Sequence, residues 1–198
     1  MKRTFIFTLL LCPTVLCPVN AFACTAQADG AVDQSFINEA NKQLALLPDY
    51  VLDAMDEDGV NLYVTDKDID SYFCDGQYGS VQGLTITQNH HTDIYIEDRE
   101  KAVCNATLHE IGHWVDDYYE GLTNTNSFVE IYQEESAAFQ KAFLINFYYD
   151  CGEFFAEGFW KYLTASDTLR DNCPQLYAYI DGVMMRIQQE QSKSCNET

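Results

Sequence analysis

The sequence predicts an α+β protein with a small sheet near the N-terminus and a helical C-terminal part. Short runs rich in Val, Ile, Thr and Tyr lie between residues 60 and 97, separated by Gly, Asp and Asn. From about Cys104 onward, the apolar residues follow the helical period of about 3.6 residues. Strands and helices therefore segregate along the chain, which favours an α+β fold over a doubly wound sheet.

The composition is that of a globular protein, with 47% hydrophobic and 21% charged residues among 198. No repeat, low-complexity tract or linker interrupts the chain, so we expect one domain over residues 24–198 with a boundary between two lobes near residues 118–125. Acidic residues outnumber basic ones by 31 to 11, for a formal charge of −20. Nucleic acids and anionic membranes require clustered Lys and Arg, so neither is an expected partner. The oligomeric state stays open.

Residues 1–23 are predicted to be a secretory signal peptide. Two basic residues precede the mostly apolar run Phe5–Val19, and Ala21–Ala23 supplies a small-x-small cleavage site. A membrane anchor is a weaker alternative, because the run is shorter than the roughly 20 apolar residues of a span. A lipid anchor on Cys24 would call for a Leu-led motif that is missing here. We therefore expect a secreted or periplasmic protein.

Six cysteines remain after this cleavage: Cys24, Cys74, Cys104, Cys151, Cys173 and Cys195. Their number is even and an exported protein meets oxidising conditions, so up to three disulfides are expected. The sequence does not choose among the roughly 15 pairings. A zinc site made of cysteines is disfavoured, because the chain has no C-x-x-C pair.

The expected elements follow in order. A first helix begins after Asp33, a plausible N-cap, and ends before Pro48. Its apolar residues share one face: Phe36, Ile37, Ala40, Leu44 and Leu47. Three strands are predicted next: Val60–Thr65, Val81–Gln88 and Asp93–Glu97. Near the C-terminus, Pro174 suits the first turn of a helix. The apolar stripe of that helix predicts a buried face: Leu176, Tyr177, Ile180, Val183, Met184 and Ile187.

The most informative motif is H-E-x-x-H, formed by His109, Glu110 and His113. On a helix, residues four apart lie on one face, so both imidazoles can reach a single zinc ion. Glu110 lies one step around the helix, where its carboxylate can accept a proton from a zinc-activated water. The context suits a helix, because Asn105 can cap it and Gly112 permits close packing. A surface helix with two solvated histidines is the alternative.

A catalytic zinc site needs a third protein ligand. Asp116 and Tyr119 stand where metzincins place Gly and His, so that class is excluded. His90 and His91 lie in a loop-like stretch and are interpreted as surface residues. A downstream glutamate is the remaining choice, and the candidates are Glu130, Glu134, Glu135, Glu153 and Glu157.

Two of these glutamates stand out. Glu153 and Glu157 are four residues apart in an aromatic-rich helical segment, so they share a face. Two like charges at this spacing repel each other unless a cation or a donor lies between them. We therefore predict that Glu153 binds zinc and that Glu157 orients one of the ligand histidines. Two solvated glutamates are the alternative.

HEIGHWVDDY, followed 40 residues after His113 by EFFAEGF, resembles the catalytic domain of anthrax lethal factor and the secreted Pro-Pro endopeptidases. The resemblance covers residues 104–185 and implies a zincin-like metalloprotease with a small mixed sheet, whose edge strand lines the substrate cleft. It also implies His109, His113 and Glu153 as zinc ligands and Glu110 as general base. Glu157 matches the second acid of the family motif.

The family also has a tyrosine before the ligand glutamate, whose hydroxyl faces the oxyanion. At the family spacing this chain has Asn146, and Tyr148 and Tyr149 follow it. Either tyrosine could donate to the developing charge, and Tyr148 is favoured. A packed aromatic pair is the alternative. The strand Thr92–Glu97 is the candidate edge strand for pairing with a peptide, with an internal strand as the equal alternative.

The sequence therefore predicts a secreted zinc metalloendopeptidase that acts on a protein or peptide substrate. The strong negative charge favours basic substrate segments. The resemblance suggests a proline-containing cleavage segment, although no residue identified here fixes that preference. Two other classes stay open. One is a secreted binding or toxin-accessory protein with an inactive zincin fold, which the intact Glu110 argues against. The other is a disulfide-stapled interaction domain without metal.

Overall fold

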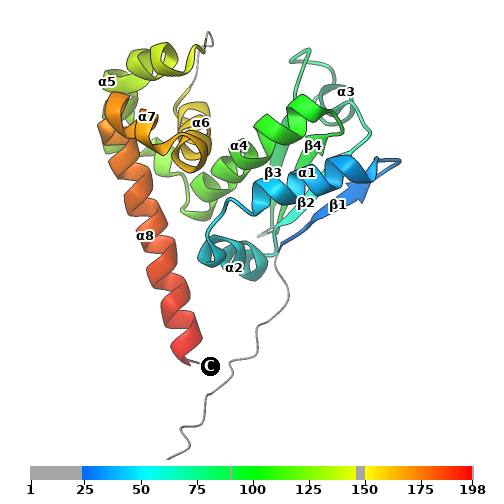
Figure 1. Cartoon of the computed structure of the whole chain (residues 1–198), viewed down its shortest axis with the longest axis horizontal. Helices are drawn as coiled ribbons and strands as arrows, with labels where there is room; N and C mark the ends of the chain where they lie inside the picture. The colour runs from blue at the N-terminus through cyan, green and yellow to red at the C-terminus, as the bar shows by residue number, and fades with distance from the viewer. Residues whose placement is uncertain (1–23, 90, 146–149, 198) are drawn as a thin grey trace, which may run out of the picture.

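The computed structural model describes residues 24–89, 91–145 and 150–197, and only the backbone of residues 195–197 (Figure 1). The strands are β1 (Ala26–Asp29), β2 (Asn61–Thr65), β3 (Gly83–Gln88) and β4 (His91–Glu97). The helices of the first half are α1 (Gln34–Leu44), α2 (Asp49–Asp58), α3 (Ile69–Phe73) and α4 (Glu100–Tyr118). The 3₁₀ turn η1 (Leu122–Asn124) leads into α5 (Asn126–Phe143), α6 (Cys151–Thr164), α7 (Ser166–Asn172) and α8 (Pro174–Glu197).

The four strands form one mixed sheet in the order β1-β2-β4-β3. β1 pairs with β2 and β2 with β4 in parallel, whereas β3 runs antiparallel to β4. The strand predicted at the edge, Thr92–Glu97, is therefore internal, and β3 is the edge strand beside α4. β4 pairs with β2 on one side and with β3 on the other, and its Ile94 and Ile96 are fully buried on the helix side of the sheet. The short, polar strand β1 had no recognisable sequence signal.

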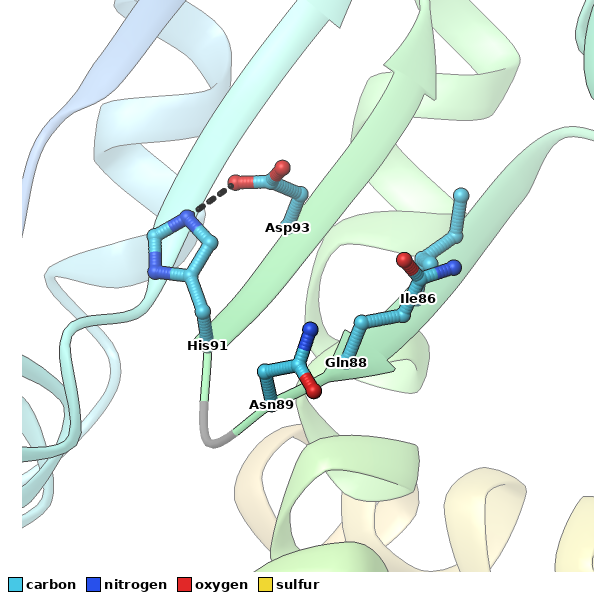
Figure 2. A pocket seen from close by; sticks show the side chains of 5 residues that line it. All are labelled: Ile86, Gln88, Asn89, His91 and Asp93. Carbon is cyan, nitrogen blue, oxygen red and sulfur yellow. Dashed lines mark ion pairs between the residues drawn. The ribbon is translucent and has the colours of Figure 1, made fainter.

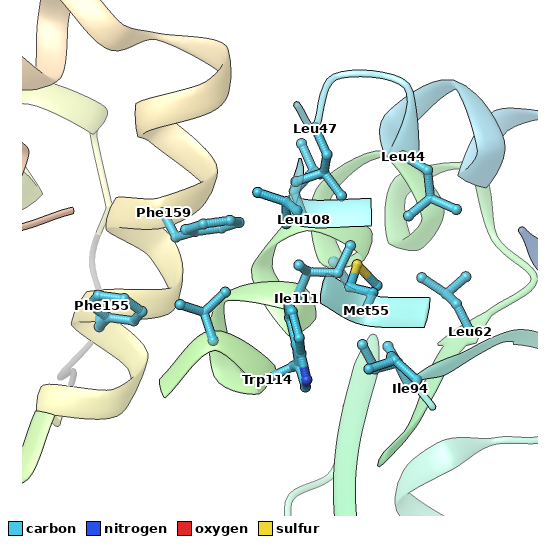
Figure 3. Close-up of a cluster of buried hydrophobic side chains, with 14 of the residues drawn as sticks. Leu44, Leu47, Met55, Leu62, Ile94, Leu108, Ile111, Trp114, Phe155 and Phe159 are labelled. Carbon is cyan, nitrogen blue, oxygen red and sulfur yellow. The ribbon is translucent and has the colours of Figure 1, made fainter. Parts of the chain in front are cut away.

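α4 forms the centre of the molecule. Figure 1 shows the sheet on one side of this helix and α5 to α8 on the other. In Figure 3, Leu108, Ile111 and Trp114 of α4 lie between sheet-side residues and the aromatic rings of α6. Phe155 and Phe159 supply those rings and are fully buried. A helix that is apolar on most sides belongs in a core, so α4 joins the two halves into one hydrophobic cluster.

Several predicted elements are confirmed. Asp33 caps α1, accepting a hydrogen bond from the Ser35 N–H at 2.8 Å. Pro174 is the first residue of α8, and that helix buries five of the six predicted stripe residues: Leu176, Ile180, Val183, Met184 and Ile187. The cap proposed at Asn105 is wrong, because α4 begins five residues earlier at Glu100. Asn105 lies inside the helix instead.

The structure does not support the expected disulfides. Cys24, Cys74, Cys104, Cys151 and Cys173 are free thiols, and the side chain of Cys195 lies outside the described part of the chain. Three of these thiols lie near oxygen atoms of residues that are distant in the sequence. The Sγ of Cys24 lies 3.7 Å from the Val60 carbonyl, that of Cys173 lies 3.9 Å from the Glu135 carbonyl, and that of Cys104 lies 3.9 Å from a Glu39 carboxylate oxygen.

Some predictions fall on residues that the structure does not describe. The predicted signal peptide (1–23), His90, Tyr148 and Tyr149 all lie outside the described residues. Within the ranges given above, no helix combines the length and the apolar character needed to cross a membrane.

Candidate metal centre

The two histidines of the H-E-x-x-H motif lie on one face of α4. His109 and His113 are one helical turn apart, and their Nε2 atoms approach to 3.1 Å. Their side chains are only 13% and 25% exposed, respectively, so both rings are largely shielded from solvent. α4 therefore presents two ring nitrogens at one point on its surface.

Glu153 reaches this point from α6. It stands in the first turn of that helix, where the capping carboxylate of Asp150 accepts from the Glu153 N–H at 2.9 Å. α4 and α6 approach closely because Gly112 has no side chain. A β-carbon at position 112 would lie 2.7 Å from the Cα of Ala156. The missing side chain thus lets α6 bring Glu153 over the two histidines.

The three side chains meet within hydrogen-bond range. The Glu153 carboxylate lies 3.3 Å from His109 Nε2 and 3.5 Å from His113 Nε2. Among the described residues, this is the only group of three His, Cys, Asp or Glu side chains whose ligand atoms converge in this way. Glu153 remains 46% exposed, so the cluster opens to solvent on one side.

Hydrogen bonds alone cannot satisfy this triangle. A carboxylate only accepts, so both ring nitrogens would have to donate to Glu153. Two donor nitrogens would then lie only 3.1 Å apart, which is an unfavourable contact. A cation at the centre accepts a lone pair from all three groups, and two imidazoles with one carboxylate are a donor set that Zn²⁺ prefers. The residues present therefore fit a zinc ion.

Glu110 faces the edge strand. Its carboxylate accepts a hydrogen bond from the Thr85 hydroxyl at 2.9 Å, and its backbone carbonyl accepts from the same hydroxyl. Gly83 leaves room for this side chain, since a β-carbon there would lie 2.6 Å from the Glu110 Cγ. Glu110 is 6% exposed. β3 and α4 together hold a buried carboxylate next to the two histidines.

The surroundings shift the pKa values of three side chains in the site: Glu110, His113 and Glu153. Burial raises the pKa of Glu110, against the opposing effect of the two histidines. Burial acts to lower the pKa of His113, but its contact with Glu153 and the charges of Glu110, Glu153 and Asp116 raise it overall. The contacts with His109 and His113 hold the pKa of Glu153 far below its usual range.

Glu157 lies one turn further along α6, on the other side of His109. Its Oε1 is 3.8 Å from His109 Nδ1, which is longer than a hydrogen bond. His109 Nδ1 and Glu157 Oε2 are buried polar atoms without a hydrogen-bond partner. The ammonium of Lys161 is 4.0 Å from Glu157 Oε2. Burial lowers the pKa of this lysine. Glu157 is the carboxylate that faces the outer nitrogen of His109.

The other predicted candidates lie elsewhere or serve other contacts. Glu135 is buried but accepts from the N–H groups of Gln175 and Leu176, so it caps α8. His91 is 53% exposed, as predicted for a surface residue. Sequence reasoning missed Thr85 and Gly83. Alternating threonines on β3 were the one available signal for Thr85, and nothing in the sequence marked Gly83.

A mixed sheet, an H-E-x-x-H helix and a carboxylate from a following helix define a zincin-like α+β fold. Comparison with known proteins agrees with that class. The family model described as "Anthrax toxin lethal factor, N- and C-terminal domain" matches residues 80–183, more than half of the chain. The chain belongs to this family.

A solved structure supports the same fold. The Pro-Pro endopeptidase from Paenibacillus alvei superposes with a TM-score of 0.58 at 18% sequence identity, over 80% of this chain and 96% of that chain. At this identity the likeness shows the fold alone. No curated protein matches the sequence significantly.

Proposed function

We propose that this protein is a secreted zinc-dependent metalloendopeptidase. One observation carries the proposal: the ring nitrogens of His109 and His113 and the carboxylate of Glu153 converge on one point, with the buried Glu110 beside them. Membership of the lethal factor family and a fold shared with a Pro-Pro endopeptidase support a peptidase.

His109, His113 and Glu153 would hold the metal. When bound, a zinc ion polarises a scissile carbonyl and makes water more acidic. Glu110 accepts the proton of the attacking water and passes it to the leaving amine. Its raised pKa suits this role, because a carboxylate with a raised pKa is the stronger base. The Thr85 hydroxyl fixes the orientation of the Glu110 carboxylate.

Two further groups complete the proposed mechanism. Glu157 orients His109 through its outer ring nitrogen. A tyrosine hydroxyl donates to the charge that develops on the carbonyl oxygen, and Tyr148 or Tyr149 is the candidate for this role. Both tyrosines follow α5 and precede α6, the helix that carries Glu153.

The substrate is proposed to be an extended peptide that pairs with the free edge of β3. An edge strand presents unpaired main-chain groups that can bind a peptide in this way. β3 also carries Gly83 and Thr85, the two residues that contact Glu110, so a peptide on this edge runs past the proposed base. With a formal charge of −20, the protein favours basic substrate segments, and the fold neighbour suggests proline at the cleavage site.

The test is proteolysis of a diverse peptide library, read by mass spectrometry, with Glu110→Gln as control. We expect cleavage by the zinc-loaded chain, and none by the variant although it still binds zinc. Enrichment of Lys or Arg near the cleaved bond, reduced at high salt, supports the charge argument. Equal cleavage by both proteins would contradict the mechanism. If neither protein cleaves, the alternative of an inactive binding protein with this fold is favoured.

Export is part of the proposal and rests on residues 1–23. The basic start, the apolar run and the small-x-small site are the supporting features. Expression of the full chain in a secreting host tests this point. We expect the protein outside the cytoplasm with Cys24 as its first residue, as read from its intact mass. A full-length protein that stays in the cytoplasm would contradict it.

A further inference from the structure

A second cluster of ligand-type side chains lies on the opposite face of the sheet. His91 and Asp93 are two residues apart on β4, so both point to the same face. The register of the parallel pair places Asn61 of β2 directly beside Asp93. On β3, Ile86 is the partner of Asp93, whereas the Glu110 contact Thr85 is the partner of the buried Ile94. The cluster is therefore separated from the H-E-x-x-H site by the sheet itself.

Three atoms of this cluster form a nearly regular triangle. His91 Nε2 is 3.1 Å from Asp93 Oδ1, and the side-chain amide of Asn61 is 3.1 Å from each of them. Ligands of a tetrahedral ion at about 2.0–2.1 Å lie about 3.3–3.4 Å apart. The edges of the triangle are close to that spacing, and also to the 3.1–3.5 Å edges of the His109, His113 and Glu153 cluster.

Protons cannot satisfy all three contacts. If the Asn61 NH₂ group donates to both neighbours, then His91 Nε2 and Asp93 Oδ1 face each other with lone pairs. If His91 donates to Asp93 instead, its donor nitrogen lies 3.1 Å from the Asn61 NH₂ nitrogen, which is also a donor. Turning the amide over, an orientation that is nearly isosteric, sets the Asn61 oxygen against the carboxylate oxygen. One contact is unfavourable in each of these three arrangements, and a cation that accepts a lone pair from each group removes the conflict.

The surroundings leave room for such an ion. His91 and Asp93 line an open pocket together with Ile86, Gln88 and Asn89, and in Figure 2 the His91 ring and the Asp93 carboxylate point toward each other at its rim. The Asp93 carboxylate is 29% exposed and the His91 side chain 53%. Water and the neighbouring side-chain amides can complete the coordination shell from the pocket side.

We propose that His91, Asp93 and Asn61 form a second metal site, which binds a divalent transition-metal ion through one ring nitrogen and two oxygens. An imidazole with a carboxylate and an amide oxygen suits Zn²⁺ and its neighbours in the series better than Ca²⁺ or Mg²⁺, which prefer oxygen alone. Three donors at an exposed position bind more weakly than a shielded site. The ion ties the start of β4 to β2, next to the edge strand.

Metal counting on the full chain tests this proposal without any measurement of turnover. Metal-free protein is titrated with Zn²⁺ by calorimetry, and bound zinc is counted after gel filtration. We expect two equivalents for the unchanged chain and one for His91→Gln. The double variant His109→Ala/His113→Ala should keep one equivalent, bound at the His91 site. The triple variant that also carries His91→Gln should bind no zinc. Crystals soaked in Zn²⁺ should give an anomalous peak beside His91 Nε2.

Controls separate a built site from weak binding to an acidic surface. Asp93→Asn should abolish the second equivalent, whereas Asp167→Asn, which removes one charge at an 86% exposed position, should leave it intact. Circular dichroism checks that each variant folds. The proposal is overturned if His91→Gln and Asp93→Asn bind as much zinc as the unchanged chain, since the cluster is then an ordinary hydrogen-bonded one. If the His109, His113 and Glu153 cluster binds no zinc, the unchanged chain should bind one equivalent and His91→Gln none. The difference between these two proteins therefore tests the second site whatever the outcome for the peptidase proposal.

Discussion

Gly112 of α4 lies directly against the backbone of Ala156 in α6, so closely that a β-carbon on Gly112 would come within 2.7 Å of the Ala156 Cα and 3.2 Å of its carbonyl oxygen. Gly112 is the residue just before His113, and Ala156 lies between Glu153 and Glu157. The contact between α4 and α6 and the candidate metal centre therefore involve the same short segments of the two helices. The distance between the two helices sets the distance between the proposed ligands.

Gly112→Ala should loosen this contact. Alanine is usually the better helix former, but here its methyl group meets backbone atoms, which no side-chain rotation can relieve. We expect a net loss of about 1–3 kcal/mol of unfolding free energy, together with weaker zinc binding. Thermal denaturation and zinc titration measure the two effects. Gly182→Ala is the matched control, because a β-carbon on Gly182 in α8 meets nothing within 4 Å. A stable Gly112→Ala variant with unchanged zinc affinity would contradict the argument.

Thr85→Val should reduce peptidase activity without loss of metal. The substitution removes the hydroxyl that donates to the Glu110 carboxylate at 2.9 Å and leaves the shape of the side chain nearly unchanged. A hydrogen bond to a charged group contributes about 1.5–3 kcal/mol, so kcat/KM should fall by about 10- to 100-fold. Steady-state kinetics with a cleaved library peptide measure this effect.

Thr87→Val provides the comparison for that experiment. Thr87 lies on the same strand and face, but its hydroxyl donates to Asp117 and not to Glu110. This variant should keep its activity and its zinc content. If both variants lose activity equally, the cause is the packing of β3, and the contact between Thr85 and Glu110 has no special role.

Substitution of Glu153 and substitution of Glu157 should have different effects on zinc affinity. Glu153 contacts both ring nitrogens, so Glu153→Gln should remove the zinc that His109 and His113 help to hold. Of the two histidines, Glu157 lies near His109 alone, at its outer nitrogen, so Glu157→Gln should keep this zinc with about 10- to 100-fold lower affinity. Competition with a chelator measures both affinities. Equal losses in the two variants would assign Glu157 a direct place among the ligands.

Much of the fold follows from local sequence signals. The cap at Asp33, the proline at the start of α8 and the alternation in β2 to β4 act over short distances, and these elements form as predicted. The order of the strands does not follow from local signals, because it depends on which strands pair with each other. β4 is internal because it pairs with both β2 and β3, whereas the pattern of Thr92–Glu97 alone fits an edge strand equally well.

In the candidate site, too, some features follow from the local sequence and others depend on the tertiary structure. His109 and His113 are adjacent on any helix, and the structure brings Glu153 to them as its spacing suggested. Their role as zinc ligands stays a prediction. Thr85 and Gly83 approach Glu110 only because β3 is the edge strand beside α4, a tertiary fact that no local pattern carries. The lone-pair conflict among His91, Asp93 and Asn61 likewise depends on the register of two strands.

Glu135→Gln tests whether the buried glutamate of α5 has a structural role and not a role in metal binding. Its two carboxylate oxygens accept from the N–H groups of Gln175 and Leu176 at 3.0 and 2.9 Å, at the positive end of the 24-residue helix α8. Glutamine keeps one acceptor but turns a donor toward the other N–H, which should cost about 1–3 kcal/mol. At roughly 2–4 °C for each kcal/mol, the melting temperature should fall measurably while zinc content and kcat/KM of the folded protein stay unchanged. Glu134→Gln is the control, since its exposed carboxylate accepts a hydrogen bond from the Gln175 side chain and not from the backbone of α8, and it should melt like the unchanged chain. Loss of zinc from Glu135→Gln would instead return Glu135 to the ligand candidates.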